Sequence, residues 1–204
     1  MQDSLGYRII NDWLRSKGFT PFPFQEETWH AIHAGQSGLV NAPTGCGKTF
    51  SVFLGSLIRF INEKGEELRS TRAAGLTLLW ITPLRALAKD IGRAMEEVIG
   101  DLGMCWEVGI RNGDTEPKER TRQKKRMPEI LLITPESLHL LLAQRHYPEL
   151  FRHLQTVAVD EWHELLGSKR GVQVELALSR LAGMARSAGR PQPSIWGISA
   201  TIGN

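Results

Sequence analysis

Hydrophobic positions along the chain follow two periods, one typical of amphipathic helices and one of buried strands. Residues 5–14 carry apolar side chains at helical spacing, and Gly18 follows where such a helix would end. Short continuous apolar runs, typical of strands covered on both faces, alternate with helical patterns farther along. The expected strands span 38–40, 76–81, 105–110, 130–133, 156–159 and 194–198. This alternation predicts an α/β fold with a mostly parallel sheet and helices on both faces.

Three connecting segments have compositions that predict irregular structure. Residues 18–25 interleave prolines with phenylalanines, which predicts an extended segment leading into a helix over 25–33. The polar stretch 62–74 is expected to be a surface loop, and 165–171 a basic turn before a helix over 172–185.

The segment Ala42–Thr49 lies between an apolar strand and an apolar helix, as a phosphate-binding loop does. Glycines allow a tight turn that brings backbone N–H groups close to an anion, and the helix adds its positive end. Lys48 would reach the β- and γ-phosphates, and the Thr49 hydroxyl would bind Mg²⁺. A chance Gly-Lys-Thr turn is the alternative, since the usual motif has glycine where this chain has Ala42. The predicted nucleotide-binding residues are Pro43, Thr44, Gly45, Cys46, Gly47, Lys48 and Thr49.

An acidic pair follows the apolar run 156–159 and predicts the second half of a nucleotide site. Asp160 would hold Mg²⁺, and Glu161 would orient and deprotonate an attacking water. His163 would couple to this pair through a hydrogen bond, which makes Lys48, Glu161 and His163 the candidate catalytic residues. The alternative is a helix N-terminus that simply favours acidic residues.

Other polar groups also follow predicted strands. Thr82-Pro83 and Thr134-Pro135 each end a strand and begin a helix, a form that is also a common N-terminal cap. Ser199-Ala200-Thr201 follows the last strand. Because parallel strands end at one edge of the sheet, we expect these groups, the loop and the acids to gather there.

Gln25 and a basic stretch each admit two interpretations. The Gln25 amide has the acceptor and donor that could read the adenine edge, or it is a helix N-terminal residue among core aromatics. Residues 117–127 carry six basic side chains and one acidic one, which indicates a solvated helix face or a contact with a nucleic-acid backbone. The whole chain carries a net charge of +3, so its positive charge is concentrated in this stretch.

Composition narrows the protein class. The 204 residues are 41% hydrophobic and 23% charged, as in one globular domain, and the two cysteines have no metal-ligand spacing. No signal-peptide pattern or membrane-length apolar run occurs. We therefore expect a soluble cytoplasmic protein without a disulfide framework.

Taken in order, the motifs resemble the first RecA-like domain of superfamily 2 helicases of the DExH type, in which Ala at position 42 is usual. The segments 111–115 and 163–171 are similar to the large helicase-related group, and 21–25 with Asp160–His163 most resemble its DNA-ligase-associated branch. The resemblance implies one RecA-like P-loop domain over 1–204, with 1–35 forming an N-terminal helix and an adenine-contacting segment. A second RecA-like domain is expected beyond Asn204.

The same resemblance implies an ATP- and Mg²⁺-dependent 3′–5′ DNA helicase or translocase acting in DNA repair. It implies that Gln25 contacts adenine and that Ser199 and Thr201 couple hydrolysis to movement. It also implies partners: single-stranded or forked DNA, and a DNA ligase or repair nuclease. An RNA helicase, an RNA-dependent ATPase and a nucleotide switch that does not translocate remain alternatives. The implied nucleic-acid contacts are Arg85, Gly113, Asp114, Thr134 and Pro135.

Overall fold

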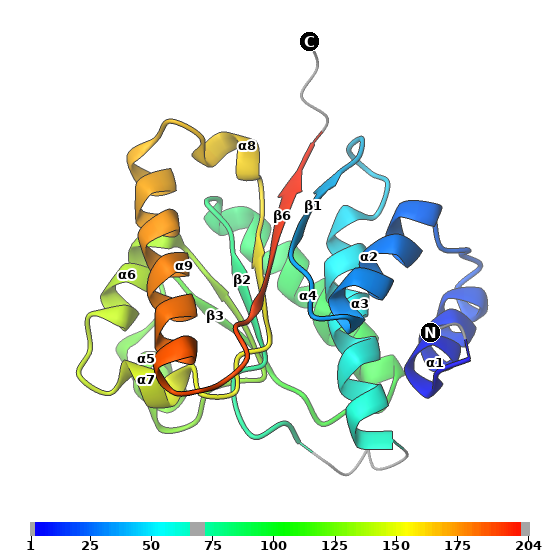
Figure 1. The fold of residues 1–204 in the computed structure, drawn as a ribbon, viewed down its shortest axis with the longest axis horizontal. Helices are drawn as coiled ribbons and strands as arrows, with labels where there is room; N and C mark the ends of the chain where they lie inside the picture. The colour runs from blue at the N-terminus through cyan, green and yellow to red at the C-terminus, as the bar shows by residue number, and fades with distance from the viewer. Residues whose placement is uncertain (1–2, 66–71, 201–204) are drawn as a thin grey trace.

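The computed structural model describes residues 3–65 and 72–200, and its centre is a six-stranded, fully parallel sheet (Figure 1). The strand order is β1-β6-β5-β2-β4-β3. The predicted α/β class with a parallel sheet is confirmed. The strands are β1 Gly38–Asn41, β2 Leu78–Ile81, β3 Val108–Arg111, β4 Ile130–Ile133, β5 Thr156–Val159 and β6 Ser194–Ser199.

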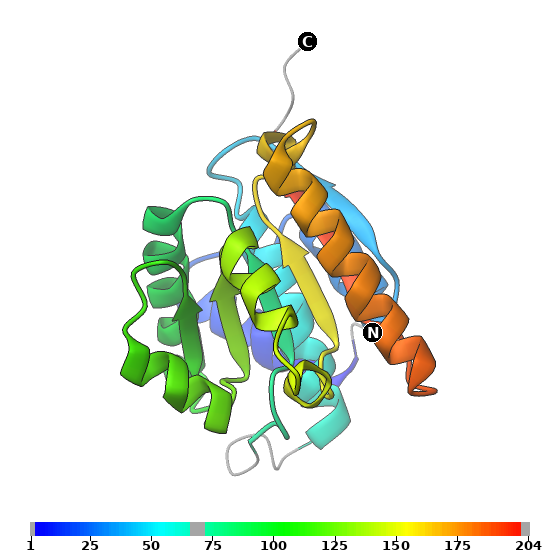
Figure 2. The ribbon, with the colours of Figure 1, turned by 90° about the vertical axis from the view of Figure 1, so that its left-hand side faces the viewer.

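Helices cover both faces of the sheet, as the pattern predicted. The first four lie on one face, and α6, α8 and α9 on the other, where Figure 2 shows α6 and α9. The helices on the first face are α1 Leu5–Ser16, α2 Pro23–His33, α3 Lys48–Lys64 and α4 Arg85–Asp101. The remaining helices are α5 Pro117–Lys125, α6 Pro135–Leu142, α7 Tyr147–Leu150, α8 Trp162–Leu165 and α9 Lys169–Ser187.

The apolar strands split their side chains between two hydrophobic clusters. In β2, Leu78 and Trp80 join the cluster under α1–α4, whereas Leu79 and Ile81 join the cluster under α6 and α9. All four side chains are fully buried. Burying one such side chain contributes about 1.5–3 kcal/mol, so a strand apolar at every position is stabilised from both faces.

Several boundaries differ from the sequence prediction. The helix expected from residue 25 begins at Pro23, because proline suits the first helical turn, where an N–H would have no partner. The loop predicted from residue 62 begins later, since α3 continues to Lys64. The basic turn 165–171 is partly helix: α9 starts at Lys169, because the Ser168 hydroxyl accepts a hydrogen bond from the Gly171 N–H at 3.0 Å.

Candidate active site

The strand order divides the carboxyl edge of the sheet into two halves. In the first half, the Ala42–Thr49 loop follows β1, Ser199 ends β6, and the acidic pair follows β5. In the second half, the segments after β2, β4 and β3 lie side by side. The predicted gathering of these groups at one edge is confirmed for the described residues, and Thr201 lies outside them.

The loop between β1 and α3 adopts a backbone that depends on glycine. Gly45 and Gly47 have φ angles of +85° and +73°, which side chains other than hydrogen disfavour. Lys48 is the first residue of α3, and its ammonium donates to the carbonyls of Ala42 at 2.7 Å and Pro43 at 2.9 Å. Seventeen residues of helix thus start directly at the lysine, with their positive end facing the loop.

Gln25 is buried against this loop. Its Nε2 donates to the Gly47 carbonyl at 3.0 Å, and its Oε1 accepts from the Phe22 N–H at 2.8 Å. Each amide atom has capacity for one further hydrogen bond. The predicted contact with adenine is compatible with this placement and stays a prediction.

A hollow of about 250 Å³ opens beside Gln25 and the glycine loop. Its walls are formed by aromatic rings from α1, from α3 and from the segment that precedes α2. The ring centroids of Trp13 and Phe50 lie 6.3 Å apart. The helical spacing of apolar residues over 5–14 did not indicate this position for Trp13, which also packs against the hydrophobic core. The lining residues include Trp13, Phe19, Phe22, Gln25, Cys46 and Phe50.

Asp160 is a buried carboxylate at the end of β5, only 4% exposed. Its Oδ1 accepts from the Glu161 N–H at 3.0 Å, and its Oδ2 accepts from the Trp80 indole at 3.4 Å. Burial, reinforced by the Glu161 charge, raises the pKa of Asp160 from 3.8 to about 6, while the Lys48 ammonium acts in the opposite direction. The loop that carries Lys48 and the strand end that carries Asp160 lie on either side of β6.

Glu161 is held in a strained backbone and linked to β6 through His163. Its φ of +48° is the one positive value at a non-glycine residue in the described part of the chain, and such strain concentrates at functional sites. His163 Nε2 lies 3.4 Å from Glu161 Oε2, and its Nδ1 lies 3.1 Å from Ser199 Oγ. The Ser199 hydroxyl also lies 2.9 Å from the Ala200 carbonyl, so the imidazole of His163 connects Glu161 to the end of β6.

The oxygen atoms in the first half of the edge fit a Mg²⁺ ion whose remaining ligands come from a bound phosphate and water. The described residues contain no group of three or more His, Cys, Asp or Glu side chains able to hold a metal alone. A single buried carboxylate, Asp160, and the half-buried Thr49 at the start of α3 remain. Magnesium typically takes one or two protein oxygens and completes its shell with phosphates and water.

The second half of the edge presents charged groups rather than threonine hydroxyls. Arg85 donates to Asp114 at 3.0 Å, its guanidinium lies against Gly113, and both charged side chains are more than half exposed. Thr82 and Thr134 are buried, and their hydroxyls bond locally, to the Leu84 N–H and to Ser137. The Thr82 hydroxyl therefore closes a turn before α4, and Thr134 occupies the N-cap position of α6 without a side-chain capping bond. Nucleic-acid contacts of Arg85, Gly113, Asp114, Thr134 and Pro135 stay predictions.

The basic helix α5 has a role that its charge did not reveal. Arg120 donates to the carbonyls of Thr115, Asn112 and Gly113 at 2.8, 3.1 and 3.0 Å. Its guanidinium thereby holds the loop after β3. The helix then descends to the amino edge, so Lys124 and Lys125 lie near the start of β4, away from the candidate site.

The sequence of this chain matches the model of a known protein family. The DEAD/DEAH box helicase family model matches residues 22–204. The chain belongs to the DEAD/DEAH box helicase family. No helix of this DEAD/DEAH box domain, within the described residues, has the length and apolar character needed to cross a bilayer.

The relatives are much longer than this DEAD/DEAH box domain. It is 36% identical to the Lhr helicase/uracil glycosylase of Escherichia coli over 94% of the chain, but spans 13% of that protein. It is 34% identical to the ATP-dependent helicase Lhr-Core protein 2 of Thermococcus barophilus, covering 95% of this chain and 23% of that one. The expected likeness to the large helicase-related group is confirmed, and the DNA-ligase-associated branch stays a prediction.

Solved structures agree with the fold. Mycobacterium smegmatis helicase Lhr bound to ssDNA and AMP-PNP superimposes with a TM-score of 0.75 at 31% identity, over 98% of this DEAD/DEAH box domain and 25% of that chain. The DUF1998 helicase MrfA bound to DNA and AMPPNP gives 0.79 at 25% identity, over 100% and 27% of the chains. The RecA-like fold expected from the motifs is confirmed.

Proposed function

We propose that this chain is the first RecA-like motor domain of an ATP-dependent DNA helicase. The observation that carries the proposal is the placement of the Lys48 loop after β1 and of Asp160 and Glu161 after β5 at the same edge of the sheet, on either side of β6, although Lys48 and Asp160 are 112 residues apart in sequence. A phosphate-binding loop and an acidic pair in this relation fit a nucleoside triphosphate and its cation. The family match and the AMP-PNP in the solved Lhr structure support ATP as that ligand.

Each residue of the first half takes a distinct part in hydrolysis. Lys48 and the loop N–H groups bind the β- and γ-phosphates. Thr49 and Asp160 would hold Mg²⁺, which would neutralise part of the phosphate charge. Glu161 accepts a proton from the water whose oxygen attacks the γ-phosphorus. The bond from that phosphorus to the bridging oxygen breaks, giving ADP and phosphate.

His163 and Ser199 connect this chemistry to β6. A proton gained by Glu161 changes the charge that faces His163 at 3.4 Å, and the same imidazole is hydrogen-bonded to Ser199 at 3.1 Å. We propose that this connection transmits hydrolysis to the segment after β6, with Thr201 taking part as the family resemblance implies.

DNA is the favoured nucleic acid because the solved structures of Lhr and MrfA were obtained with DNA. The second half of the edge, with exposed Arg85, would face its backbone. A 3′–5′ direction, a repair role, a cytoplasmic location, and a ligase or nuclease partner are further proposals that rest on the family resemblance. A second RecA-like domain would supply arginines worth about 10³–10⁵ in rate, so the chain alone should hydrolyse ATP slowly.

Glu161→Gln tests the catalytic assignment. We expect unchanged affinity for a fluorescent ATP analogue and loss of phosphate release in a sensitive single-turnover assay. Glu164→Gln is the matched control, since Glu164 is exposed and lies in α8, the short helix that Glu161 precedes. Phosphate release by Glu161→Gln at the wild-type rate would place the base elsewhere, and stimulation by RNA but not by single-stranded DNA would exclude the DNA assignment.

A further inference from the structure

Three adjoining hollows lie at the amino edge of the sheet, the end opposite the candidate active site. Their volumes are about 290, 670 and 370 Å³, and all three are lined by Arg152. Thr77, Glu129 and Gln155, which line two of them, directly precede β2, β4 and β5. The hollows therefore form one continuous surface under the starts of the central strands.

This surface is strongly basic, and we call it the amino-edge basic surface. Its cations come from α3, α5, the turn after α7, α9 and the segment before β6, so the fold assembles it from distant parts of the chain. The lining acids are Glu63, Glu129 and Glu149. The lining Arg and Lys residues are Arg59, Lys64, Lys124, Lys125, Arg126, Arg152, Arg180 and Arg190.

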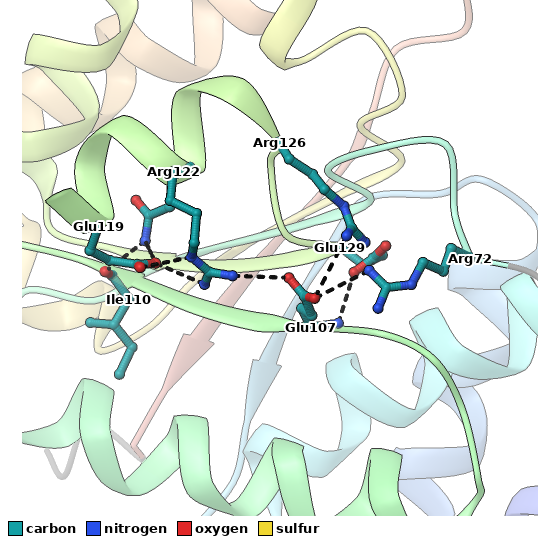
Figure 3. Close-up of polar contacts among 8 residues, drawn as sticks. Arg72, Glu107, Ile110, Glu119, Arg122, Arg126 and Glu129 are labelled. Carbon is teal, nitrogen blue, oxygen red and sulfur yellow. Dashed lines mark hydrogen bonds and ion pairs between the residues drawn. The ribbon is translucent and has the colours of Figure 1, made fainter.

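Part of this positive charge is neutralised within the protein. Figure 3 shows Glu107 paired with three arginines. Guanidinium nitrogens of Arg72, Arg122 and Arg126 lie 3.2, 3.4 and 3.9 Å from the Glu107 carboxylate oxygens. The neighbouring Glu129 is buried, and its carboxylate accepts the Glu107 N–H at 2.7 Å. This network fixes the end of α5 against the sheet and occupies Arg126.

Other cations of the surface are exposed and have no acidic partner among the described residues. Lys124 and Lys125 extend from the end of α5 beside the network, and Arg152 lies between all three hollows. The ion pairs of the described chain involve none of these three side chains. The hollow that these three cations share is lined by two acids, the buried Glu129 and the exposed Glu149. The cations outnumber the acids, so the hollow attracts a polyanion.

We propose that the amino-edge basic surface binds the phosphate backbone of nucleic acid, as a contact separate from the carboxyl edge. An acidic protein segment fits less well, because protein interfaces need exposed apolar anchors at their centre. The large apolar side chains exposed in the described chain lie elsewhere, and none lines these hollows. Phosphate binding needs only well-placed cations and a surface that admits the strand.

This proposal goes beyond the proposed function, since it concerns neither ATP hydrolysis nor the carboxyl edge. A strand that contacts both edges would pass around the domain rather than across its active face alone. Single-stranded and duplex nucleic acid share the required phosphate chemistry, and the experiment separates them.

The test compares the triple variant Lys124→Gln, Lys125→Gln, Arg152→Gln with wild type. Fluorescence anisotropy measures affinity for oligo(dT) and for a duplex, each about 30 nucleotides long, over a series of salt concentrations. Losing three phosphate contacts should reduce the slope of log affinity against log salt by about 2 on single strands, or nearly 3 on duplex. Each reduction is compared with the value expected for its own form, and the form whose slope falls by that value is the one bound.

The matched control is Arg8→Gln, Lys89→Gln, Arg93→Gln, which removes the same charge from exposed positions of α1 and α4. Its slope should equal that of wild type, and both variants should keep wild-type melting curves and ATP-analogue affinity.

An unchanged slope in the first variant, or an equal reduction in both, overturns the proposal while leaving the proposed function intact. The proposal is also overturned if the first variant loses binding to polyglutamate and keeps its binding to single-stranded and duplex DNA. That result would assign the surface to an acidic protein. Failure of wild type to bind any DNA would overturn the proposed DNA function as well.

Discussion

Replacing Asp160 with asparagine should stabilise the folded chain above pH 7 in metal-free, nucleotide-free buffer, while abolishing ATP hydrolysis. The side chain is almost fully buried, and an ionised carboxylate there lacks most of its hydration. Asparagine has nearly the same shape but no charge. The variant therefore removes the cost of burying the charge and keeps the packing.

The magnitude follows from the pKa of Asp160, which rises from 3.8 in an unfolded chain to about 6 in the folded one. This difference corresponds to about 3 kcal/mol. Because the folded state binds the proton more tightly, folding stability falls as pH rises from about 4 through about 6, and the full penalty applies above that range. Asparagine escapes this penalty at every pH.

The substitution also has a cost. The two oxygens of Asp160 accept from the Glu161 N–H and the Trp80 indole, and the asparagine amide can present oxygen to only one of them. The loss of one long hydrogen bond costs about 1 kcal/mol. We expect a net gain of about 2 kcal/mol at pH 7.5 and a net loss of about 1 kcal/mol at pH 4.

Urea unfolding followed by tryptophan fluorescence, repeated from pH 4 to pH 8 with EDTA, measures this difference. Asp90→Asn is the control, since Asp90 is exposed on α4 and forms no ion pair in the described chain. A stability difference between Asp160→Asn and wild type that does not change with pH, or a less stable variant at pH 7.5, would refute the reasoning.

Two further predictions concern the loops of the carboxyl edge. Gly47→Ala should destabilise the fold by about 1–2 kcal/mol and weaken binding of a fluorescent ATP analogue, because its φ is +73° and the new methyl would lie 2.9 Å from Gln25 Nε2. Gly45→Ala, with φ +85° and open space around it, should show the strain without the loss of the Gln25 contact, and equal affinities would contradict the argument. Arg120→Gln should lower affinity for single-stranded DNA several-fold, because it releases the loop after β3. Lys118→Gln removes the same charge and should leave the affinity unchanged. Faster hydrogen exchange of the loop in Arg120→Gln would confirm the cause.

The sequence by itself determined the elements and the chemistry of the first half of the edge. Continuous apolar runs identify strands buried on both faces, and the glycine loop and acidic pair are recognised because each lies within a few residues of a strand end. Errors fell at the boundaries of helices and strands. The helices expected from residues 25 and 172 begin at Pro23 and Lys169, and the strands expected from residues 76 and 105 begin at Leu78 and Val108.

Only the tertiary structure decided which distant groups meet. The strand order, and with it the division of the edge into two halves, depends on crossovers that local patterns do not encode. The basic charge of residues 117–127 could not show that Arg120 holds a loop while Lys124 and Lys125 turn to the opposite edge. Trp13 enters the hollow beside Gln25 for the same reason: the composition of a segment sets what it can do, and long-range packing sets where its side chains lie.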